Sequence, residues 1–248
     1  TPIASSAASD VYKRQMEVYN LKSKKTLILF FALAMVATAC SSAAVPCDEV
    51  EITTGENGLP DLDGCEFTFA VENAYLPFNY IDAETGEAMG WDYDVFNYMG
   101  ELMNFTPVYI PTAWDGMIQA TADGQFMIAG DGITITAERD EIVDFSNGYI
   151  NLAQRVLVAS GNTEITSLQD LIDGDYTVAT QKGTTNYEFA VSALGEDKVQ
   201  AFDDFNFAIQ AVISGDADAS IIDETAGLGY MGANKDQVKL VGDDLTSC

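Results

Sequence analysis

Short apolar runs alternate with helical patterns along the chain from Phe67 onward. Runs rich in β-branched and aromatic residues predict strands, because such side chains fit a pleated, half-buried surface. These runs lie at residues 67–71, 108–110, 127–129 and 155–159. Strands that alternate with helices indicate an α/β fold.

The stretch from Tyr93 to Met103 has the periodicity of an amphipathic helix. Its apolar residues recur at spacings that place them on one helical face, and Asp92 is the expected N-cap. The apolar residues are Val95, Phe96, Met99, Leu102 and Met103.

A second block repeats the same alternation. It predicts strands at 176–179 and 219–222 and helices at 184–194 and 204–213. Two similar α/β lobes are therefore expected, at 66–152 and 153–248, with the chain crossing over near residues 152–156. Residues 40–65 lack periodicity and predict a tether.

Acidic residues dominate the composition. The 248 residues include 39 Asp and Glu against 11 Lys and Arg, a formal charge of -28. Such a chain repels nucleic acid and anionic membrane surfaces, so neither is an expected partner. A solvated surface that favours solubility, or a salty habitat, also explains the acidity. With 48% hydrophobic residues the chain is expected to fold.

Histidine is absent. This excludes the usual general base, the Ser-His and Cys-His nucleophile arrangements, and the commonest transition-metal ligand. Enzymes that work with carboxylates alone remain compatible with the sequence. No metal and no cofactor are expected.

Residues 16–39 have the parts of an export signal. A basic start precedes a short apolar run and small residues, as in a cleavable signal peptide, and the run is short for a membrane span. Cys40 directly follows Ala37-Thr38-Ala39, which resembles the lipobox of bacterial lipoproteins and implies a lipid on Cys40. Plain secretion and an uncleaved anchor are the alternatives. Residues 1–15 fit none of these parts and are expected to be a non-native leader.

The part after the signal is more acidic still. Residues 1–39 hold five of the 11 basic and two of the 39 acidic residues, which leaves six and 37. Cys47 and Cys65 flank a stretch rich in Gly, Pro and Asp and could form a disulfide in an oxidising compartment, or remain free. Cys248 would be unpaired and is interpreted as a truncation artefact.

Two aromatic patches follow predicted strands. Tyr75 and Phe78 come after the first strand, and Trp114 lies at a strand-to-helix turn. Ligands of α/β proteins generally bind at the carboxyl ends of strands, so these rings could form the walls of a stacking site. Ordinary core packing is the alternative for Phe78 and for the Trp114 indole.

Arg139 is one of only two arginines after the signal, and it follows a glycine-flanked, hydroxyl-rich turn. Its planar fork of donors suits a carboxylate. Thr134 is expected to face the same ligand, while Ile133 and Ile135 alternate into the core. The alternative is that Arg139 forms a structural ion pair, with Asp140, Glu141 or Asp144.

The second lobe offers a complementary pair of features. Gly183-Thr184-Thr185-Asn186 opens a predicted helix, whose first N–H groups suit a carboxylate, and Asp223 ends a strand and suits an ammonium. Helix capping by the threonines and a turn role for Asp223 are the alternatives. Together the four patches describe a site for a zwitterion.

Six spaced motifs between about Phe67 and Val241 resemble the periplasmic solute-binding proteins for polar amino acids, which supply ATP-binding-cassette importers. This resemblance implies the two-lobed type II periplasmic-binding-protein fold, a periplasmic or extracellular location and a monomer. The motifs are Tyr75-Leu-Pro-Phe78, Gly90-Trp-Asp-Tyr-Asp94, Trp114-Asp-Gly116, Gly132-Ile-Thr-Ile-Thr-Ala-Glu-Arg139 with Val143-Asp-Phe-Ser146, Gly183-Thr-Thr185, and Ala217-Asp-Ala-Ser-Ile-Ile-Asp-Glu224.

The resemblance also implies roles for individual residues. Tyr75 and Trp114 would flank the ligand side chain, with Arg139 and the Thr185 N–H on its α-carboxylate, a Thr134 hydroxyl contact and Asp223 on its α-ammonium. Asp131 and Gly132 stand where family members often have serines. Asp131 is therefore expected either to face a cationic ligand side chain or to cap a turn.

The resemblance implies an incomplete first lobe as well. The second lobe is expected to be near complete, whereas nothing after Val241 corresponds to the segment that returns to the first lobe in this family. The expected function is capture of a polar amino acid by lobe closure and its delivery to the permease subunits of an importer, with no membrane contact except through the lipid. The alternatives are a sensing module of a signalling protein and a dehydratase-like enzyme on the same scaffold.

Overall fold

The computed structural model describes residues 45–234 and 237–247, which belong to one compact unit, Ala43–Cys248. The expected leader, the signal peptide, Cys40 and Cys248 lie outside the described residues. Within the described ranges, no helix has the length and apolar character that a membrane span requires.

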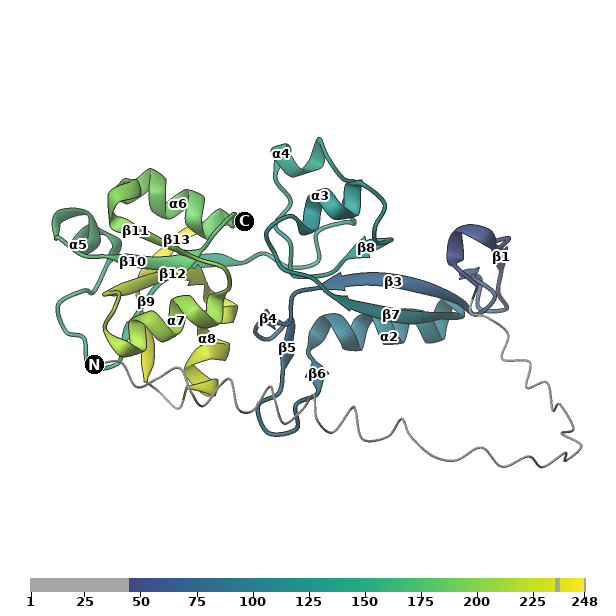
Figure 1. Ribbon diagram of the computed structural model, residues 1–248, viewed down its shortest axis with the longest axis horizontal. Helices are drawn as coiled ribbons and strands as arrows, with labels where there is room; N and C mark the ends of the chain where they lie inside the picture. Colours follow the sequence, from purple (N-terminus) through teal and green to yellow (C-terminus); the bar gives the residue numbers. More distant parts are fainter. Residues whose placement is uncertain (1–44, 235–236, 248) are drawn as a thin grey trace, which may run out of the picture. The chain divides into compact units, whose positions relative to one another are not determined.

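The first lobe is built on a sheet of three parallel strands. Strand β3 (Cys65–Val71) lies between β7 (Phe105–Pro111) and β8 (Ile128–Ala129). Helix α2 (Trp91–Met103) packs against β7 and α3 (Met117–Ala122) packs against β8, on opposite sides of the sheet in Figure 1. The predicted strands and the first predicted helix therefore exist, with ends that differ by a few residues.

Alternation along β3 separates two small cores. Phe69 stacks on Phe96 of α2, with ring centroids 4.2 Å apart, whereas the next residue, Ala70, packs with Trp114 and Met117. Successive side chains of a strand point to opposite faces, so β3 joins the two cores. The core around Ala70 contains the indole of Trp114, which is a predicted site residue.

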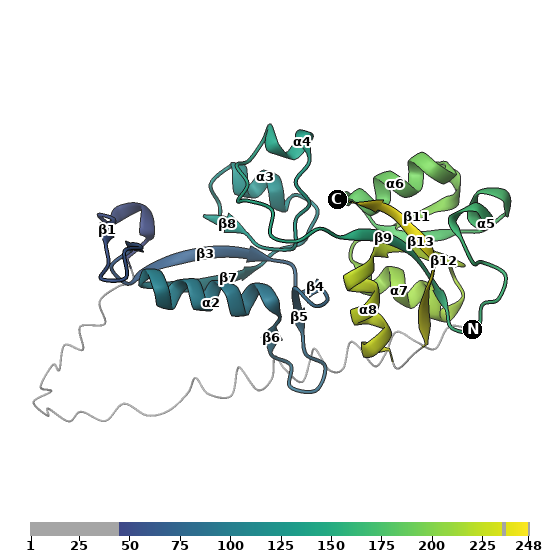
Figure 2. The ribbon, with the colours of Figure 1, turned by 180° about the vertical axis from the view of Figure 1, so that it is seen from behind.

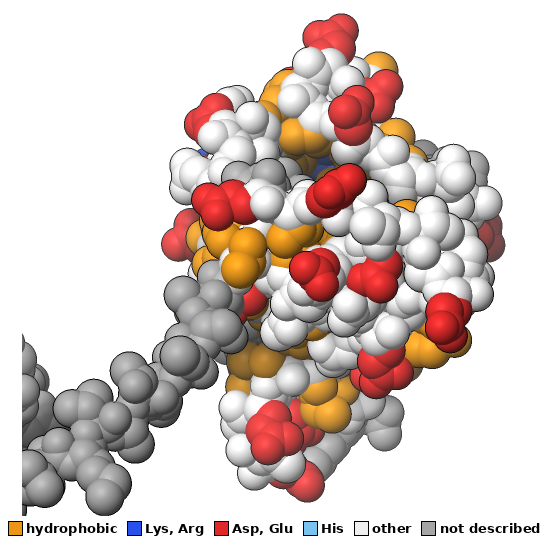
Figure 3. Space-filling model, turned by 90° about the vertical axis from the view of Figure 1, so that its right-hand side faces the viewer, with side chains coloured by type: hydrophobic (Ala, Val, Ile, Leu, Met, Phe, Trp, Pro, Cys, Tyr) orange, Lys and Arg blue, Asp and Glu red, His pale blue; other side chains and the backbone are white. Residues whose placement is uncertain are grey.

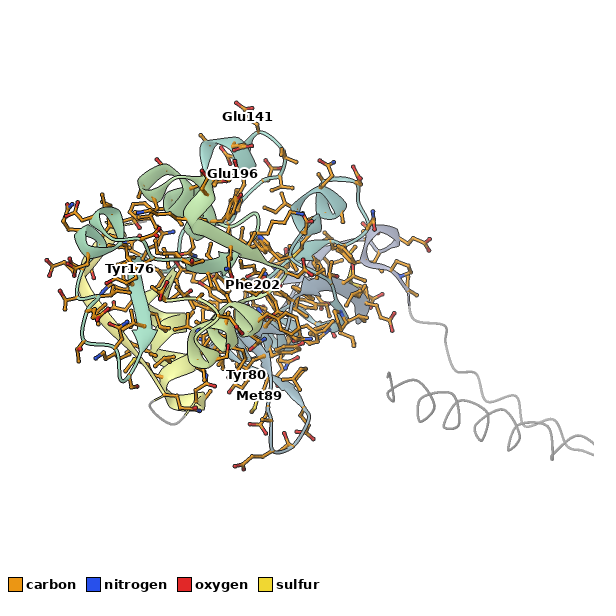
Figure 4. The ribbon with its side chains drawn as sticks, turned by 60° about the vertical axis from the view of Figure 1, so that its left-hand side comes forward. Tyr80, Met89, Glu141, Tyr176, Glu196 and Phe202 are labelled. Atoms are coloured by element: carbon orange, nitrogen blue, oxygen red, sulfur yellow. A yellow bond between two sulfur atoms is a disulfide. The ribbon has the colours of Figure 1, made fainter. Side chains whose placement is uncertain are left out.

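A small antiparallel sheet follows β3 and brings the chain back. It consists of β4 (Ala74–Tyr75), β5 (Asn79–Ile81) and β6 (Ala88–Met89). Tyr80 of β5 pairs with Met89 of β6, and the two labelled side chains lie close together in Figure 4. Tyr75 pairs with Asn79 in the same way, so this sheet fixes the segment that carries the first aromatic patch.

The second lobe contains a five-stranded mixed sheet with the order β11-β10-β12-β9-β13. Strand β10 runs parallel to β11 and β12, and β9 runs antiparallel to β12 and β13. The strands are β9 (Ala153–Ala159), β10 (Val178–Gln181), β11 (Val199–Phe202), β12 (Ala219–Asp223) and β13 (Val238–Ser247).

Helices cover both faces of this second sheet. Figure 2 shows α7 and α8 on one side and α5 and α6 on the other. Leu157 of β9 packs in the core under α7 and α8, whereas its neighbours Val156 and Val158 pack in the core under α5 and α6. The helices are α5 (Leu168–Asp173), α6 (Thr185–Leu194), α7 (Phe205–Ser214) and α8 (Glu224–Ala233), with a short 3-10 helix, η2 (Glu196–Lys198), before β11.

Strand β13 extends the second sheet and not the first. It pairs with β9 from Val238 to Val241 and again at Thr246 and Ser247. Within residues 45–234 and 237–247, the sheet of the first lobe has three strands.

The expected tether is partly folded, which corrects the prediction for residues 40–65. Cys47 forms a disulfide with Cys65 at the start of β3. Leu62 is buried beside both cysteines, in the core that contains Phe69 and Phe105. This segment contains a 3-10 helix, η1 (Cys47–Glu49), and a hairpin of β1 (Thr53–Thr54) and β2 (Pro60–Asp61). Composition alone missed this because its few apolar residues pack on a neighbouring core.

Two local predictions are wrong. Gly90, not Asp92, is the N-cap of α2, and Asp92 is buried within the first turn. Gly90 has φ 130°, and a Cβ there would lie 2.3 Å from the carbonyl oxygen of Phe78, so only glycine fits. Ile135 is 49% exposed and does not enter the core, although Ile133 is partly buried against Trp114 as expected.

Candidate functional site

A cavity lined largely by polar side chains lies where strands of both lobes end. The carboxyl ends of β3, β7 and β8 supply residues of the first lobe, and those of β10, β11 and β12 supply residues of the second. Loops at strand ends leave backbone groups and side chains free for ligands. The lining residues are Glu72, Tyr75, Trp114, Asp131, Gly132, Ile133, Thr134, Arg139, Gln181, Thr184, Thr185, Asn186, Phe205 and Asp223.

Arg139 reaches the cavity from the short helix α4 (Ala137–Asp140), which Thr136 caps through its side chain. The guanidinium donates to the carbonyl oxygens of Thr134 at 2.9 Å and Gly183 at 3.4 Å, and it lies 5.2 Å from the centre of the Trp114 ring. Burial lowers its pKa, although nearby acidic residues oppose the shift.

Arg139 forms no ion pair within the described residues. The predicted alternative of a structural pair with Asp140, Glu141 or Asp144 therefore has no support, and Glu141 points away from the molecule in Figure 4. A buried guanidinium without a carboxylate is costly to maintain. Its remaining donors are suited to an anion that enters the cavity.

Two of the predicted aromatic side chains, Trp114 and Tyr75, line the cavity. Trp114 is 8% exposed and donates its indole N–H to the Gly183 carbonyl at 3.1 Å, so it belongs to the core and to the site at once. Tyr75 is stacked between Phe78 and Phe205, at centroid distances of 5.0 and 5.7 Å. Phe78 does not line the cavity, so this predicted ligand residue supports Tyr75 from behind.

Asp223 lines the cavity on the side of the second lobe. It accepts a hydrogen bond from the Tyr75 hydroxyl and another from the Asn186 amide. Burial raises the pKa of Asp223, while these two bonds and Arg139 lower it. Asp223 occupies the N-cap position of α8, but its side chain makes no capping bond, so the expected turn role is not what holds it.

The start of α6 forms the floor beside Arg139. Thr184 is the N-cap: its hydroxyl accepts from the Tyr187 N–H at 3.1 Å and donates to the Gln181 carbonyl at 2.7 Å. The Thr184 hydroxyl is therefore committed to the protein, as the capping alternative predicted. The Thr185 hydroxyl accepts from Gln154, and the first-turn N–H groups of α6 give this end of the cavity a positive potential.

Asp131 and Gly132 complete the wall next to Tyr75. Gly132 has φ 54°, and a Cβ there would lie 2.7 Å from the Tyr75 ring, so a side chain would displace that wall. Asp131 is 4% exposed and accepts from the Asn79 amide at 2.6 Å. The same amide donates to Asp92 at 2.8 Å, and burial raises the pKa of Asp92 to about 6.

Besides Ile133, which was expected in the core, three lining residues were missed by the sequence predictions: Glu72, Gln181 and Phe205. Glu72 and Gln181 are hydrogen bonded to each other across the cavity at 2.6 Å. Each of the three lies at or directly beyond the carboxyl end of a parallel strand or its following turn, and this position was a usable signal. Acidic and apolar side chains are too common in this chain for Glu72 and Phe205 to stand out by residue type.

The face shown in Figure 3 is acidic, as is the chain as a whole. Acidic side chains are scattered over the face shown in Figure 3, where basic side chains are barely visible. No group of three His, Cys, Asp or Glu side chains in the described ranges is arranged to hold a metal ion.

Two α/β lobes that share a polar cavity at their strand ends, with an unpaired arginine on one side and an aspartate on the other, define a two-lobed solute-binding protein. Residues 67–241 match the family model of the bacterial extracellular solute-binding proteins, family 3, and the chain belongs to this family. The resemblance expected from the motifs is thus confirmed.

Relatives agree with this assignment. The chain is 30% identical over 174 residues to a probable histidine-binding protein of Neisseria gonorrhoeae, covering 69% of this chain and 63% of that protein. It is 28% identical over 155 residues to the cyclohexadienyl dehydratase of Pseudomonas aeruginosa, covering 62% and 58%. The chain thus spans less than two thirds of the length of either relative.

Solved structures resemble the fold as well. An ancestral arginine-binding protein bound to glutamine superimposes with a TM-score of 0.67 at 32% identity, and the match covers 72% of this chain and 78% of that one. The expected two-lobed α/β fold is therefore confirmed.

Proposed function

We propose that this protein captures a polar amino acid outside the cytoplasmic membrane and delivers it to an ATP-binding-cassette importer. The observation that carries the proposal is the buried Arg139 guanidinium, which has no carboxylate partner among the described residues and faces the start of α6 and Asp223 in one cavity. Arg139 and the first N–H groups of α6 bind the α-carboxylate, and Asp223 binds the α-ammonium.

The cavity walls account for the rest of the ligand. Tyr75 and Trp114 enclose the side chain, and the contacts that join the lobes around it hold the closed form. Similarity to amino-acid-binding relatives supports this role. The lipid on Cys40 keeps the protein at the membrane, and a Cys40→Ala variant is expected in the soluble fraction of a bacterial host instead of the membrane fraction.

Titration calorimetry of the purified protein with a panel of L-amino acids tests the proposal. A saturable one-site isotherm is expected for at least one amino acid. For that ligand, the α-amide and the N-acetyl derivative should bind at least about tenfold more weakly, because each loses one charged contact. Failure of every amino acid in the panel to bind would overturn the proposal.

Arg139→Ala is the matching change in the protein. It should abolish the isotherm, while Arg155→Lys, which alters the second arginine of the described residues, one that lies outside the cavity, should leave the isotherm intact. Delivery is tested by uptake of the labelled ligand into cells with and without the gene. Equal uptake in both would remove the transport role and leave capture.

A dehydratase activity is the second candidate, since one relative is a cyclohexadienyl dehydratase and the cavity contains buried carboxyls. A carboxyl that keeps its proton near neutral pH can serve as a general acid. Mass spectrometry of each bound ligand after hours of incubation decides between the two. A dehydrated product would favour the enzyme, whereas recovery of unchanged ligand favours capture.

A further inference from the structure

Helix α8 of the second lobe contacts the first lobe at residues that do not line the cavity. The buried Tyr230 hydroxyl donates a hydrogen bond to the carbonyl oxygen of Ala74, in β4, at 2.7 Å. The neighbouring Gly229 faces Leu76, the residue that follows β4. Figures 1 and 2 both show α8 next to β4. We call this pair of interactions the α8–β4 contact.

Glycine at position 229 permits the close approach of the two lobes. A Cβ at Gly229 would lie 2.8 Å from the Cβ of Leu76 and 3.6 Å from its carbonyl carbon. Non-bonded carbon atoms prefer a separation of about 3.5–4.0 Å, so even an alanine would push Leu76 away. Glycine is unfavourable inside a helix, and the contact with the first lobe gives a physical reason for its presence in α8.

Apolar packing surrounds the α8–β4 contact and crosses between the lobes. Tyr75 and Phe78 of the first lobe share one core with Phe205 of α7 and Tyr230 of α8, and Leu76 packs against it. This apolar surface stays away from water only while the lobes are together. The shared core therefore stabilises the closed arrangement by itself, independently of any ligand.

The α8–β4 contact is linked to the cavity through the backbone on both sides. Tyr75, which lines the cavity, lies between Ala74 and Leu76, and Asp223, which also lines it, directly precedes α8. Gly229 lies about 9 Å from Asp223 along the helix axis, at 1.5 Å per residue. A change that separates Gly229 from Leu76 would therefore separate two cavity walls without touching a ligand between them.

We propose that the α8–β4 contact determines the affinity for the bound amino acid from outside the cavity. The proposal rests on the proposed function, in which groups of both lobes hold the ligand. Such a ligand binds the closed arrangement, so its apparent dissociation constant increases as the closed fraction of the protein decreases. An interaction that exists only in the closed arrangement strengthens binding, even where it does not reach the ligand.

Gly229→Ala is the first test, with Gly232→Ala as its matched control. Both changes add one methyl group to α8 and favour the helix. A Cβ at Gly232 has no neighbour within 4 Å, whereas a Cβ at Gly229 collides with Leu76. Calorimetric titration with each common L-amino acid should show a dissociation constant raised about 5- to 100-fold in Gly229→Ala, the range expected for overpacking. Gly232→Ala should remain within about twofold of the parent.

Two outcomes of this titration are distinct. Equal dissociation constants in the parent and in Gly229→Ala would overturn the proposal and leave amino-acid capture standing, because the contact would then persist unchanged when the ligand leaves. Absence of binding to the parent for every amino acid would overturn the proposed function and this proposal together.

Tyr230→Phe tests the hydrogen bond of the same contact. The ring remains, but the Ala74 carbonyl loses this donor while the lobes are closed and regains water when they open. We expect the dissociation constant to rise about 5- to 100-fold. Tyr98→Phe, at a side chain 61% exposed, is the control and should bind as the parent does.

Urea unfolding of the ligand-free variants separates this role from a general structural one. A contact that only supports the fold would lower the free energy of unfolding and leave the dissociation constant of the folded protein unchanged, and this result would overturn the proposal. We expect weaker binding in variants whose circular dichroism and cooperative unfolding match those of the parent. If Gly229→Ala does not fold, the titration of Tyr230→Phe decides.

Discussion

The Tyr75 hydroxyl donates a hydrogen bond to the Asp223 carboxylate, and this bond joins the strand that follows β3 to the end of β12. Both side chains are buried or nearly so, and burial raises the pKa of each. Asp223, the proposed partner of the ligand ammonium, is thus already engaged by a neutral donor when the protein is alone. A carboxylate has enough lone pairs to accept from both.

Tyr75→Phe tests this bond. The ring still stacks between Phe78 and Phe205, but a buried carboxylate loses a donor, so the free energy of unfolding should fall by about 1–3 kcal/mol. Urea unfolding of the ligand-free protein measures the change. Tyr98→Phe, at a side chain 61% exposed, is the control and should differ by less than about 0.5 kcal/mol. Equal losses in the two variants would show that the bond contributes nothing specific.

Arg139→Met separates binding from stability. Methionine approximates the volume of the arginine but removes a buried cation that has no carboxylate partner in the described part of the chain. We expect the free energy of unfolding without ligand to fall by no more than about 1 kcal/mol. The rise in melting temperature on addition of the amino acid should disappear. A large loss of stability would instead assign Arg139 a structural role.

The Cys47–Cys65 disulfide should stabilise the folded protein, because it links residues 18 positions apart and restricts the unfolded chain. The double variant Cys47→Ala/Cys65→Ala is expected to lose about 3 kcal/mol of unfolding free energy with little change in ligand affinity. Reducing agent should destabilise the parent protein and leave the double variant unaffected. Loss of binding in a folded double variant would indicate that the bridge also shapes the site.

Stability of the ligand-free protein should decrease as the pH rises from about 5 to about 7.5. The folded-state pKa values of Glu72 and Asp92 are raised to about 7 and about 6, so in this window the folded protein holds protons that the unfolded chain has lost. Stability is therefore fully present below the ordinary carboxyl pKa and is lost as these groups ionise. Asp61, Asp82 and Asp170, whose pKa values are lowered, act only at more acidic pH.

Melting temperature against pH measures this dependence. Glu72→Gln should flatten the upper part of the curve, because it removes the group whose folded-state pKa is about 7. The exposed Glu101→Gln variant should retain the parent slope. A parent melting temperature that rises steadily over this window would contradict the assignment.

Scarcity determined which site residues could be recognised from sequence. Arg139 and Trp114 stand out because the chain has few arginines and tryptophans. Trp114 follows a predicted strand and Arg139 follows a glycine-flanked, hydroxyl-rich turn, which was enough to expect both at a ligand site. Glu72 lies at an equally informative strand end, but it is one of 39 acidic residues and offers no contrast. Gln181 also lies at a strand end, but its contact with Glu72 from the other lobe is one that no local pattern encodes.

The fold of the two lobes was more predictable than that of the segment before β3. Alternation of strands and helices depends on burial along one element, so the sheet of the first lobe, three of the five strands of the second sheet, and helices α2, α6 and α7 follow from periodicity. Strands β11 and β13 and helices α5 and α8 were not predicted from the sequence. The folding of residues 46–64 depends on a disulfide and on one buried leucine against α2, and these are tertiary contacts. Thr184 shows the same limit: its residue type suits a ligand and a cap equally, and only the observed bonds decide.

Direct bonds join the two lobes at the cavity and beside it. Trp114 donates to Gly183, Gln181 donates to Glu72, and the buried Tyr230 hydroxyl donates to the Ala74 carbonyl at 2.7 Å. For the proposed amino-acid ligand, we expect entry and exit to require such bonds to break together. We therefore expect the residence time of that ligand to be governed by how often the protein opens, and not by how fast the ligand diffuses.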